Sequence, residues 1–377
     1  MLNWQISCNF AFEKILFHNL RFRLIISLLN ETAIRENSCL FLFRGICDDM
    51  SGIFLTFAHV TIRHLTDMRK IIGIGETIMD IIFKNGAPTA AVPGGSVFNG
   101  IISLGRLGAN VTIISETGND RVGREILKFM EANGVDSRNV NVYEDGRTAI
   151  SLAWLNDKND AEYDFYKDYP KARLDVEWPV IEKDDIVMMG SYFVLNPALR
   201  PKVKEFLTYA RSRGALIYYD FNFRSTHKDE AIKLYADILE NLEFADIVRG
   251  STEDLDNMFG MSDPLVVYKK EIDFYCKNML CTDAGGNIRL IAPQVNKEYE
   301  VTPVETVSTI GAGDNFNAGI IFGLLREGVG RDDLACLPEE KWNKIVASGM
   351  ALASHVCQSF NNSISKEFAE TYLASLK

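Results

Sequence analysis

The chain has 377 residues, of which 47% are hydrophobic and 24% charged, so it is long enough for one large globular domain or two modest ones. The net charge of −11 argues against nucleic acid or an anionic membrane surface as the main partner. The seven cysteines form no CxxC pair and no Cys/His metal spacing, which argues against a disulfide framework or a zinc site and predicts a cytoplasmic protein with reduced thiols.

The first 67 residues differ from the rest of the chain. They hold three of the five histidines, and their six basic and six acidic side chains cancel. No helical or alternating period persists through them, no secretory signal is recognisable, and the longest uncharged run, 50–62, is too short to span a bilayer. We expect residues 1–67 to lie outside the folded domain, as an upstream extension of the reading frame. A regulatory or anchoring extension is the alternative.

From Met68 onward, short apolar strand patterns alternate with helix patterns. The predicted strands are Ile71–Ile74, Val111–Ser115, Ile186–Met189, Leu216–Asp220, Ala245–Val248, Met279–Thr282 and Ile288–Ala292. The predicted helices are one that ends at Leu107, Val122–Asn133, Pro201–Arg213, Asp229–Leu242, Thr252–Phe259, one that begins near Asp314, Lys341–Phe360 and Lys366–Leu376. This order predicts an α/β fold for residues 68–377, with a doubly wound, mainly parallel sheet flanked by helices.

Two hairpins interrupt this alternation. Asn85-Gly86 is a two-residue turn signal within the segment 80–92. The polar segment 156–160 separates two strand patterns within 148–166. We place both hairpins in a small β-sheet that projects from the main body, and the alternative is an edge hairpin of the main sheet.

The stretch 309–319 reads Thr-Ile-Gly-Ala-Gly-Asp-Asn-Phe-Asn-Ala-Gly and predicts a loop that turns into a helix. The first N–H groups of such a helix have no partner inside it and can hold an anion such as a phosphate. Glycines at 311 and 313 let the anion approach the backbone. Asp314 then suits a base that takes a proton from a hydroxyl attacking the phosphate. The alternative is an ordinary helix start, with Asp314 as an exposed cap.

A second glycine-rich helix entry, Gly94-Gly95-Ser96-Val97-Phe98-Asn99, precedes this stretch by more than 200 residues. With Gly105 and Gly118 downstream, and with Gly311-Ala312-Gly313-Asp314 followed by Ala318-Gly319, it resembles the two signatures of the PfkB-type (ribokinase-like) carbohydrate kinase family. The resemblance extends from Met68 to near the C-terminus. It implies an ATP-dependent carbohydrate kinase with a ribokinase-like fold.

The resemblance implies catalytic roles at one of the two signatures. Asp314 matches the catalytic base, which deprotonates the sugar hydroxyl as it attacks the γ-phosphate of ATP. Gly311, Ala312 and Gly313 match the anion hole, whose amides stabilise charge on the transferring phosphoryl group. Gly311 and Gly313 thereby also belong to the predicted nucleotide site.

The other signature implies the sugar site. Asp80 matches the carboxylate that binds sugar hydroxyls, and Gly94, Gly95 and Asn99 match the sugar-binding loop. The hairpin 148–166 matches the lid that closes over the sugar and excludes water. In the family this lid often carries a dimer contact, which makes a homodimer through the lid a prediction for this chain.

Three further positions match the family in part. Thr282 and Gly285 lie where the family has its nucleotide-binding turn, although Ala284 stands where glycine is frequent. Asp254 keeps the charge of a motif tied to magnesium and phosphate, and an ordinary helix N-terminus is the alternative for it. Ser308 replaces an aspartate that many members have near a monovalent-cation site, so a monovalent-cation cofactor is in doubt.

The stretch Asp220-Phe221-Asn222-Phe223-Arg224 resembles one found in fructokinase-like and 2-keto-3-deoxygluconate kinase-like members. We therefore predict transfer from ATP, with Mg²⁺, to a primary hydroxyl of a small sugar, and we rank a fructokinase-like role first. A sugar-acid kinase and a ribokinase are the alternatives. Arg224 and Arg147 are candidates to bind a substrate carboxylate, or are solvated surface charges. A non-catalytic sugar-binding relative is a further alternative, against which the retained Asp314 argues.

Overall fold

The structure is a computed structural model that describes residues 69–156, 161–283 and 286–376. The expectations for residues 1–67 and for Gly285 therefore lie outside the described residues. In the described ranges, no helix is both long and apolar enough to cross a membrane.

The centre of the domain is a ten-stranded sheet in the order β14-β13-β12-β11-β10-β9-β1-β4-β5, with β6 also paired to β4. Its strands are β1 (Lys70–Ile74), β4 (Asn110–Gly118), β5 (Val135–Asp136), β6 (Val140–Tyr143), β9 (Ile186–Gly190), β10 (Leu216–Asp220), β11 (Ile247–Ser251), β12 (Met279–Thr282), β13 (Ile288–Ala292) and β14 (Val295–Tyr299). All pairs are parallel except β12–β13 and β13–β14 at one edge. The predicted doubly wound, mainly parallel sheet is thus confirmed.

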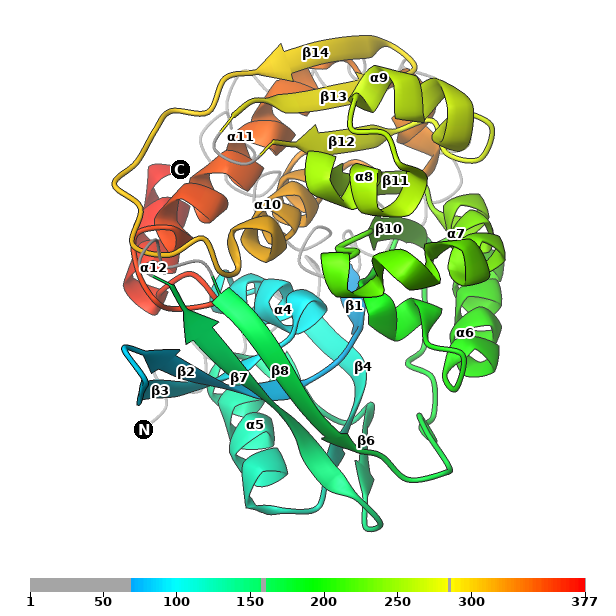
Figure 1. The fold of residues 1–377 in the computed structure, drawn as a ribbon. Helices are drawn as coiled ribbons and strands as arrows, with labels where there is room; N and C mark the ends of the chain where they lie inside the picture. The colour runs from blue at the N-terminus through cyan, green and yellow to red at the C-terminus, as the bar shows by residue number, and fades with distance from the viewer. Residues whose placement is uncertain (1–68, 157–160, 284–285, 377) are drawn as a thin grey trace, which may run out of the picture. The chain divides into compact units, whose positions relative to one another are not determined.

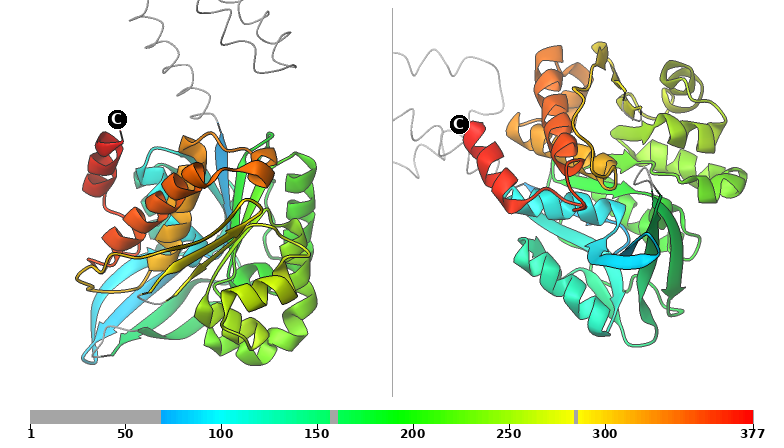
Figure 2. Two further views of the ribbon diagram at one scale, coloured as in Figure 1. Left: turned by 90° about the horizontal axis from the view of Figure 1, so that it is seen from above. Right: turned by 60° about the vertical axis from the view of Figure 1, so that its left-hand side comes forward.

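Helices cover both faces of this sheet (Figures 1 and 2). They are α4 (Ser96–Arg106), α5 (Arg121–Ala132), α6 (Arg200–Ser212), α7 (Ala231–Phe244), α8 (Thr252–Phe259), α9 (Pro264–Val267), α10 (Ala312–Arg326), α11 (Glu339–Val356) and α12 (Lys366–Ser375). Successive strand residues point to opposite faces, so Ile71 packs with α4, α5, α10, α11 and α12, whereas Ile72 packs with α6, α7 and α8. Helix α10 is buried along most of its length because it lies between α4 and α11.

A separate four-stranded sheet projects from this body (Figure 1). Its order is β3-β2-β7-β8, formed by β2 (Ile78–Lys84), β3 (Ala87–Gly94), β7 (Arg147–Leu155) and β8 (Ala161–Asp168). Asn85 and Gly86 both have positive φ, as the two-residue turn between β2 and β3 requires. The predicted lid sheet is confirmed. On β8, Phe165 and Tyr166 are 50% and 56% exposed, and a homodimer through the lid stays a prediction.

Several elements of the structure are not predicted by the sequence. Strands β5 and β6 have two and four residues, which is too short for a periodic signal. Strand β14 reads Val-Asn-Lys-Glu-Tyr and buries only its two ends, as an edge strand can. The sequence also does not predict helix α9 or the π-helical turn after it, Tyr268–Ile272, because four or five residues are too few to show a 3.6-residue period.

Candidate active site

The two glycine-rich helix entries meet in space. Asn99, in the first turn of α4, donates from Nδ2 to Oδ2 of Asp314, in the first turn of α10, at 2.8 Å. The two residues are 215 positions apart and both are buried. Asp314 is therefore not the exposed cap of the alternative interpretation.

The surroundings of Asp314 make its carboxyl a weak acid. Its pKa is raised to about 7: burial is the largest cause and the neighbouring Asp220 adds to it, while the hydrogen bond from Asn99 and the positive charges of Arg224 and Arg249 act in the opposite direction. A group with a pKa near neutrality can accept and release a proton in ordinary cellular conditions. Asp314 thus has the acidity that a general base needs.

The start of α10 has donors that point out of the helix. Gly311 is the N-cap with φ 78°, and its carbonyl accepts the first helical hydrogen bond from Asn315 at 2.9 Å. The N–H of Ala312 donates to the carbonyl of Thr309 at 3.2 Å, so this amide is already partly used. The N–H groups of Gly313 and Asp314 have no partner inside the helix, because they belong to its first turn. They are the amides best placed for an anion.

Asp80, on β2, is held by groups from two distant segments. Ser151 of β7 donates to Oδ1 at 2.5 Å, and Nδ2 of Asn362 donates to Oδ2 at 3.2 Å. Burial is the main cause that raises the pKa of Asp80 to about 6. A Cβ on Gly94 would lie 2.1 Å from Oδ2 of Asp80, so the glycine leaves the space that this carboxylate occupies. Gly95 has φ 126°, and a Cβ added to it would lie 2.1 Å from the carbonyl oxygen of Glu76.

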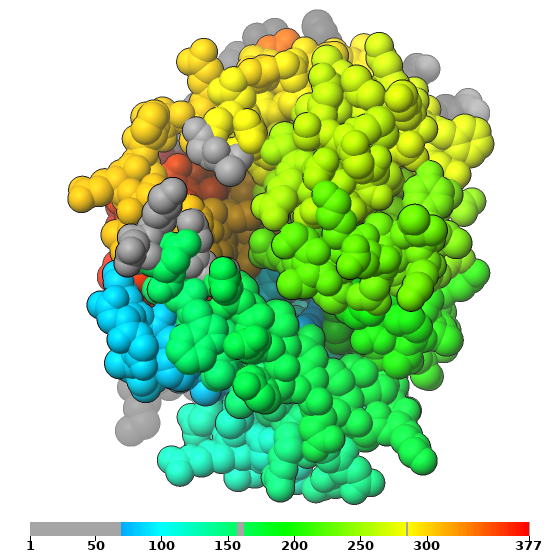
Figure 3. All heavy atoms as spheres, in the orientation of Figure 1, coloured from blue at the N-terminus to red at the C-terminus, as the bar shows by residue number. Residues whose placement is uncertain are grey.

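The lid covers the region between the two carboxylates. The pKa of the Tyr163 hydroxyl on β8 is raised, first by burial and then by the charges of Asp80 and Asp314. This side chain therefore lies near both carboxylates. Arg224 lies near the same groups, since its charge opposes the rise at both Tyr163 and Asp314. In the space-filling view, the surface of the molecule is hollowed beside the lid, and α10 is visible inside the hollow (Figure 3).

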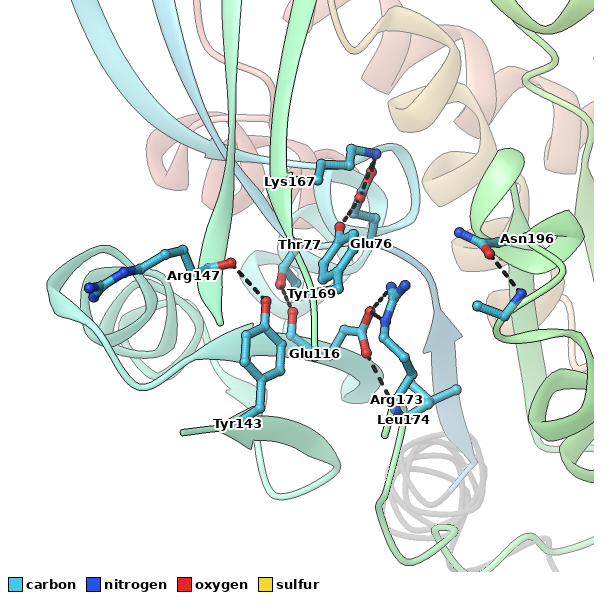
Figure 4. Close-up of polar contacts among 11 residues, drawn as sticks. Glu76, Thr77, Glu116, Tyr143, Arg147, Lys167, Tyr169, Arg173, Leu174 and Asn196 are labelled. Atoms are coloured by element: carbon cyan, nitrogen blue, oxygen red, sulfur yellow. Dashed lines mark hydrogen bonds and ion pairs between the residues drawn. The ribbon is translucent and has the colours of Figure 1, made fainter. Parts of the chain in front are cut away.

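A second polar cluster joins the root of the lid to the main sheet (Figure 4). Lys167 and Tyr169, at the end of β8 and just beyond it, both bind the carboxylate of Glu76. Arg173 donates from Nε to Glu116 of β4 at 2.7 Å in a buried ion pair. The exposed side chain of Arg147 points away from this cluster, and only its backbone carbonyl takes part. The structure does not bring Arg147 to the sugar site.

On the nucleotide side, Thr282 ends β12 and accepts a hydrogen bond from Nη2 of Arg249 at 2.6 Å. Asp254 lies in a capping box at the start of α8. Its Oδ1 accepts from the N–H of Phe223 at 2.7 Å, and its Oδ2 accepts from the N–H and the hydroxyl of Ser251, also at 2.7 Å each. A carboxylate has about four lone-pair sites. The helix-capping interpretation of Asp254 therefore describes most of its contacts.

The sequence profile of the pfkB family carbohydrate kinases matches residues 68–368. The chain belongs to this family. Among its relatives, a probable fructokinase-7 of Arabidopsis thaliana is 24% identical over 72% of this chain and 81% of its own length. A 5-dehydro-2-deoxygluconokinase of Geobacillus thermodenitrificans is 25% identical over 70% of this chain and 79% of its own length.

Solved structures of similar proteins agree on the ribokinase-like fold. Aminoimidazole riboside kinase from Salmonella enterica superposes with a TM-score of 0.69 at 20% identity, over 82% of this chain and 100% of that one. A fructokinase from Vibrio cholerae, solved with fructose, ADP and potassium ion, also gives a TM-score of 0.69, at 18% identity, over 81% of this chain and 98% of that one. At such identities the likeness speaks for the fold alone.

Four site residues escaped the sequence reading: Ser151, Tyr163, Arg249 and Asn362. Ser151 and Tyr163 lie in lid strands that the sequence predicts. Their position on the inward-facing side of these strands was the signal that could have identified them. Asn362 follows α11 in a loop, where no period marks a residue. Arg249 directly follows the predicted strand Ala245–Val248, and a charged residue within the buried strand β11 was a signal that could have been used.

Proposed function

We propose that this pfkB family kinase transfers the γ-phosphate of ATP to a primary hydroxyl of a small sugar, in the manner of a fructokinase. The observation that carries the proposal is the contact between Asn99 and Asp314. It places one buried carboxylate at both the predicted sugar loop and the helix start that can hold a phosphate. A phosphoryl acceptor and a phosphoryl donor can therefore reach the same base.

The reaction needs one proton transfer and one bond exchange. Asp314 takes the proton of the sugar hydroxyl, and the oxygen lone pair of that hydroxyl forms a bond to the γ-phosphorus. The bond between this phosphorus and the bridging oxygen of the β-phosphate breaks, and its electron pair leaves with ADP. The N–H groups of Gly313 and Asp314 face the charge of the transferring phosphoryl group.

The sugar side is rich in hydrogen-bond acceptors. Besides the carboxylates of Asp80 and Asp314, the side-chain oxygens Oδ1 of Asn99 and Oδ1 of Asn362 are buried and lack a partner among the described residues. Buried acceptors without partners are costly. A ligand with several hydroxyl groups would supply the missing donors, and Tyr163 would cover it. This chemistry supports a polyhydroxylated substrate.

Magnesium is proposed as the companion of ATP. The described residues contain no group of three or more carboxylate, histidine or cysteine side chains that could hold a metal ion by themselves. Because three hydrogen bonds already reach Asp254, it has room for one further contact, such as a metal-bound water. Phosphate oxygens and water would supply the other ligands, as is usual for Mg²⁺, and the ion would neutralise phosphate charge.

A panel of sugars tests the proposal. ADP release would be measured with ATP, Mg²⁺ and one of fructose, ribose or 2-keto-3-deoxygluconate, and ³¹P NMR would identify the phosphorylated hydroxyl. We expect sugar-dependent release that greatly exceeds the rate without sugar, and a product phosphorylated at a primary hydroxyl. If the wild-type chain and an Asp314→Asn variant consume ATP equally slowly with every sugar, the kinase proposal is wrong.

A sugar acid is the second candidate, because Arg224 lies near the site and two relatives are named 5-dehydro-2-deoxygluconokinase. An arginine fork can form charge-assisted hydrogen bonds with a carboxylate, worth about 1.5–3 kcal/mol each. Arg224→Ala should then lower kcat/KM for 2-keto-3-deoxygluconate by roughly 10- to 150-fold, and less for fructose. Arg147→Ala is the comparison, and its outward side chain predicts no change. Equal values for both sugars in wild type and Arg224→Ala would remove Arg224 from substrate recognition.

A further inference from the structure

Arg249 is a buried cation beside the start of α10. It lies on β11 between β10 and β12, and it is 7% exposed. Its Nη1 donates to Oδ1 of Asp220 at 3.1 Å, and its Nη2 donates to Oγ1 of Thr282 at 2.6 Å. Both partners stand at the carboxyl ends of their strands, where ligands of such sheets bind. The cation therefore lies at the edge of the sheet that carries the site.

The two Nη atoms of the guanidinium lie beside Gly313. A Cβ on Gly313 would be 3.0 Å from Nη1, 3.1 Å from Nη2 and 3.4 Å from Cζ. A point at these three distances lies on the side of the two Nη atoms and oblique to the guanidinium plane, whereas a point above the face would be nearest to Cζ. The fork thus faces the helix turn whose amides are available to an anion.

The contacts of Arg249 within the protein do not use its donors fully. Its guanidinium has five N–H groups, and two hydrogen bonds from it are seen, to Asp220 and Thr282. Its Nε is buried and has no partner among the described residues. Burying an ion pair seldom stabilises a fold more than apolar packing would. Stability alone is therefore a weak reason for a buried arginine at this position.

The charges around the start of α10 call for a cation. Three carboxylates surround this cation. The charges of Asp220 and Asp254 act on Arg249, and the charges of Asp220 and Arg249 act on Asp314. Together the three carboxylates would repel the phosphates of ATP. Arg249 is the buried positive group among these carboxylates. It is also held firmly, because the other oxygen of Asp220 accepts from Nδ2 of Asn317 on α10 at 2.9 Å.

We propose that Arg249 is a catalytic residue whose guanidinium binds the phosphoryl group while it passes from ATP to the sugar. Asp220 and Thr282 position the fork, and the N–H groups of Gly313 and Asp314 bind the same group from the helix side. Arg249 stays protonated throughout and only donates hydrogen bonds. The inference rests on the proposed kinase function and adds a fixed cation to it.

Arg249→Met tests this role. Loss of one donor to a developing charge typically lowers kcat by about 10²–10³-fold, and we expect that fall at unchanged ADP affinity. Inhibition by ADP and aluminium fluoride in the presence of sugar, which mimics the group in transfer, should weaken by a similar factor. Arg249→Lys keeps the charge without the fork, so its kcat should lie between the two.

Arg200→Met is the matched control. Arg200 is another buried arginine, 8% exposed, which binds Asn241 and Glu240 away from the site on α6 and α7. The Arg200→Met substitution should lower Tm while kcat stays within threefold of wild type. If a folded Arg249→Met or Arg249→Lys keeps kcat and aluminium fluoride inhibition within threefold of wild type, Arg249 is only structural. An inactive wild type on every sugar would instead refute the proposed function itself.

Discussion

Replacing Asp314 with Asn is expected to lower kcat by roughly 10²–10⁴-fold, because a positioned general base contributes a factor of that size. The change corresponds to about 3–5 kcal/mol of activation free energy. Asn keeps the shape of the side chain and an oxygen that can accept from Nδ2 of Asn99, so the fold and ADP binding should persist. Steady-state kinetics and ADP titration measure the two quantities. A folded variant that keeps more than a tenth of wild-type kcat would show that another group is the base.

The raised pKa of Asp314 makes a second, independent measurement possible. In wild type the base works only when deprotonated, so kcat/KM should rise with pH through the folded pKa of about 7. A carboxyl that is harder to ionise in the folded protein binds its proton more tightly there than in the unfolded chain. Its contribution to the free energy of unfolding therefore falls as pH rises from near 4 to about 7.

Asp314→Asn removes that penalty and should unfold at a higher temperature than wild type at pH 8. The difference between about 7 and the ordinary 3.8 corresponds to at most about 4 kcal/mol. At pH 4 the two Tm values should nearly converge, since the wild-type carboxyl is then protonated in the folded protein and close to half protonated in the unfolded chain. A variant that is less stable than wild type at pH 8 would contradict a buried, costly carboxylate.

The fold was predictable because its signals are local. Strands such as Leu216–Asp220 are continuous apolar runs since both faces of the sheet are covered, and Asn85-Gly86 specifies a two-residue turn. The boundaries moved where tertiary contacts extend an element beyond its apolar core. Strand β4 continues through the polar Glu116 and Thr117 because these residues bind lid-root groups and pair with β6.

The site was predictable only in part. Glycines and the carboxylates beside them leave a mark in the sequence because backbone geometry demands them, as at Gly311 and Asp314. Contacts between distant segments leave no such mark. Asn362 reaches Asp80 across 282 positions, and no period or spacing of the chain announces that pairing. Arg147 and Arg224 had equal claims in the sequence, but the side chain of Arg147 points away from the lid-root cluster, whereas the charge of Arg224 acts on Asp314.

Gly94→Ala is expected to abolish most of the sugar binding without touching a sugar-binding side chain. The new Cβ would lie 2.1 Å from Oδ2 of Asp80 and 3.3 Å from Nδ2 of Asn362, so the carboxylate must leave its place. Two hydrogen bonds from a sugar to a charged group, at about 1.5–3 kcal/mol each, would be lost or weakened. We expect kcat/KM for the sugar to fall by at least about 100-fold, mainly through KM, with ADP affinity unchanged.

Gly86→Ala is the matched control, since it makes the same substitution in the same hairpin. Its Cβ would meet no atom within 4 Å, and the positive φ of 76° costs only some stability of the turn. Sugar kinetics should stay within threefold of wild type while Tm falls slightly. Asp80→Asn separates charge from shape, because it keeps a side chain of the same size and removes the carboxylate. If Gly94→Ala folds and binds the sugar with an unchanged KM, Asp80 does not hold the sugar and the acceptor must bind elsewhere in the hollow beside the lid.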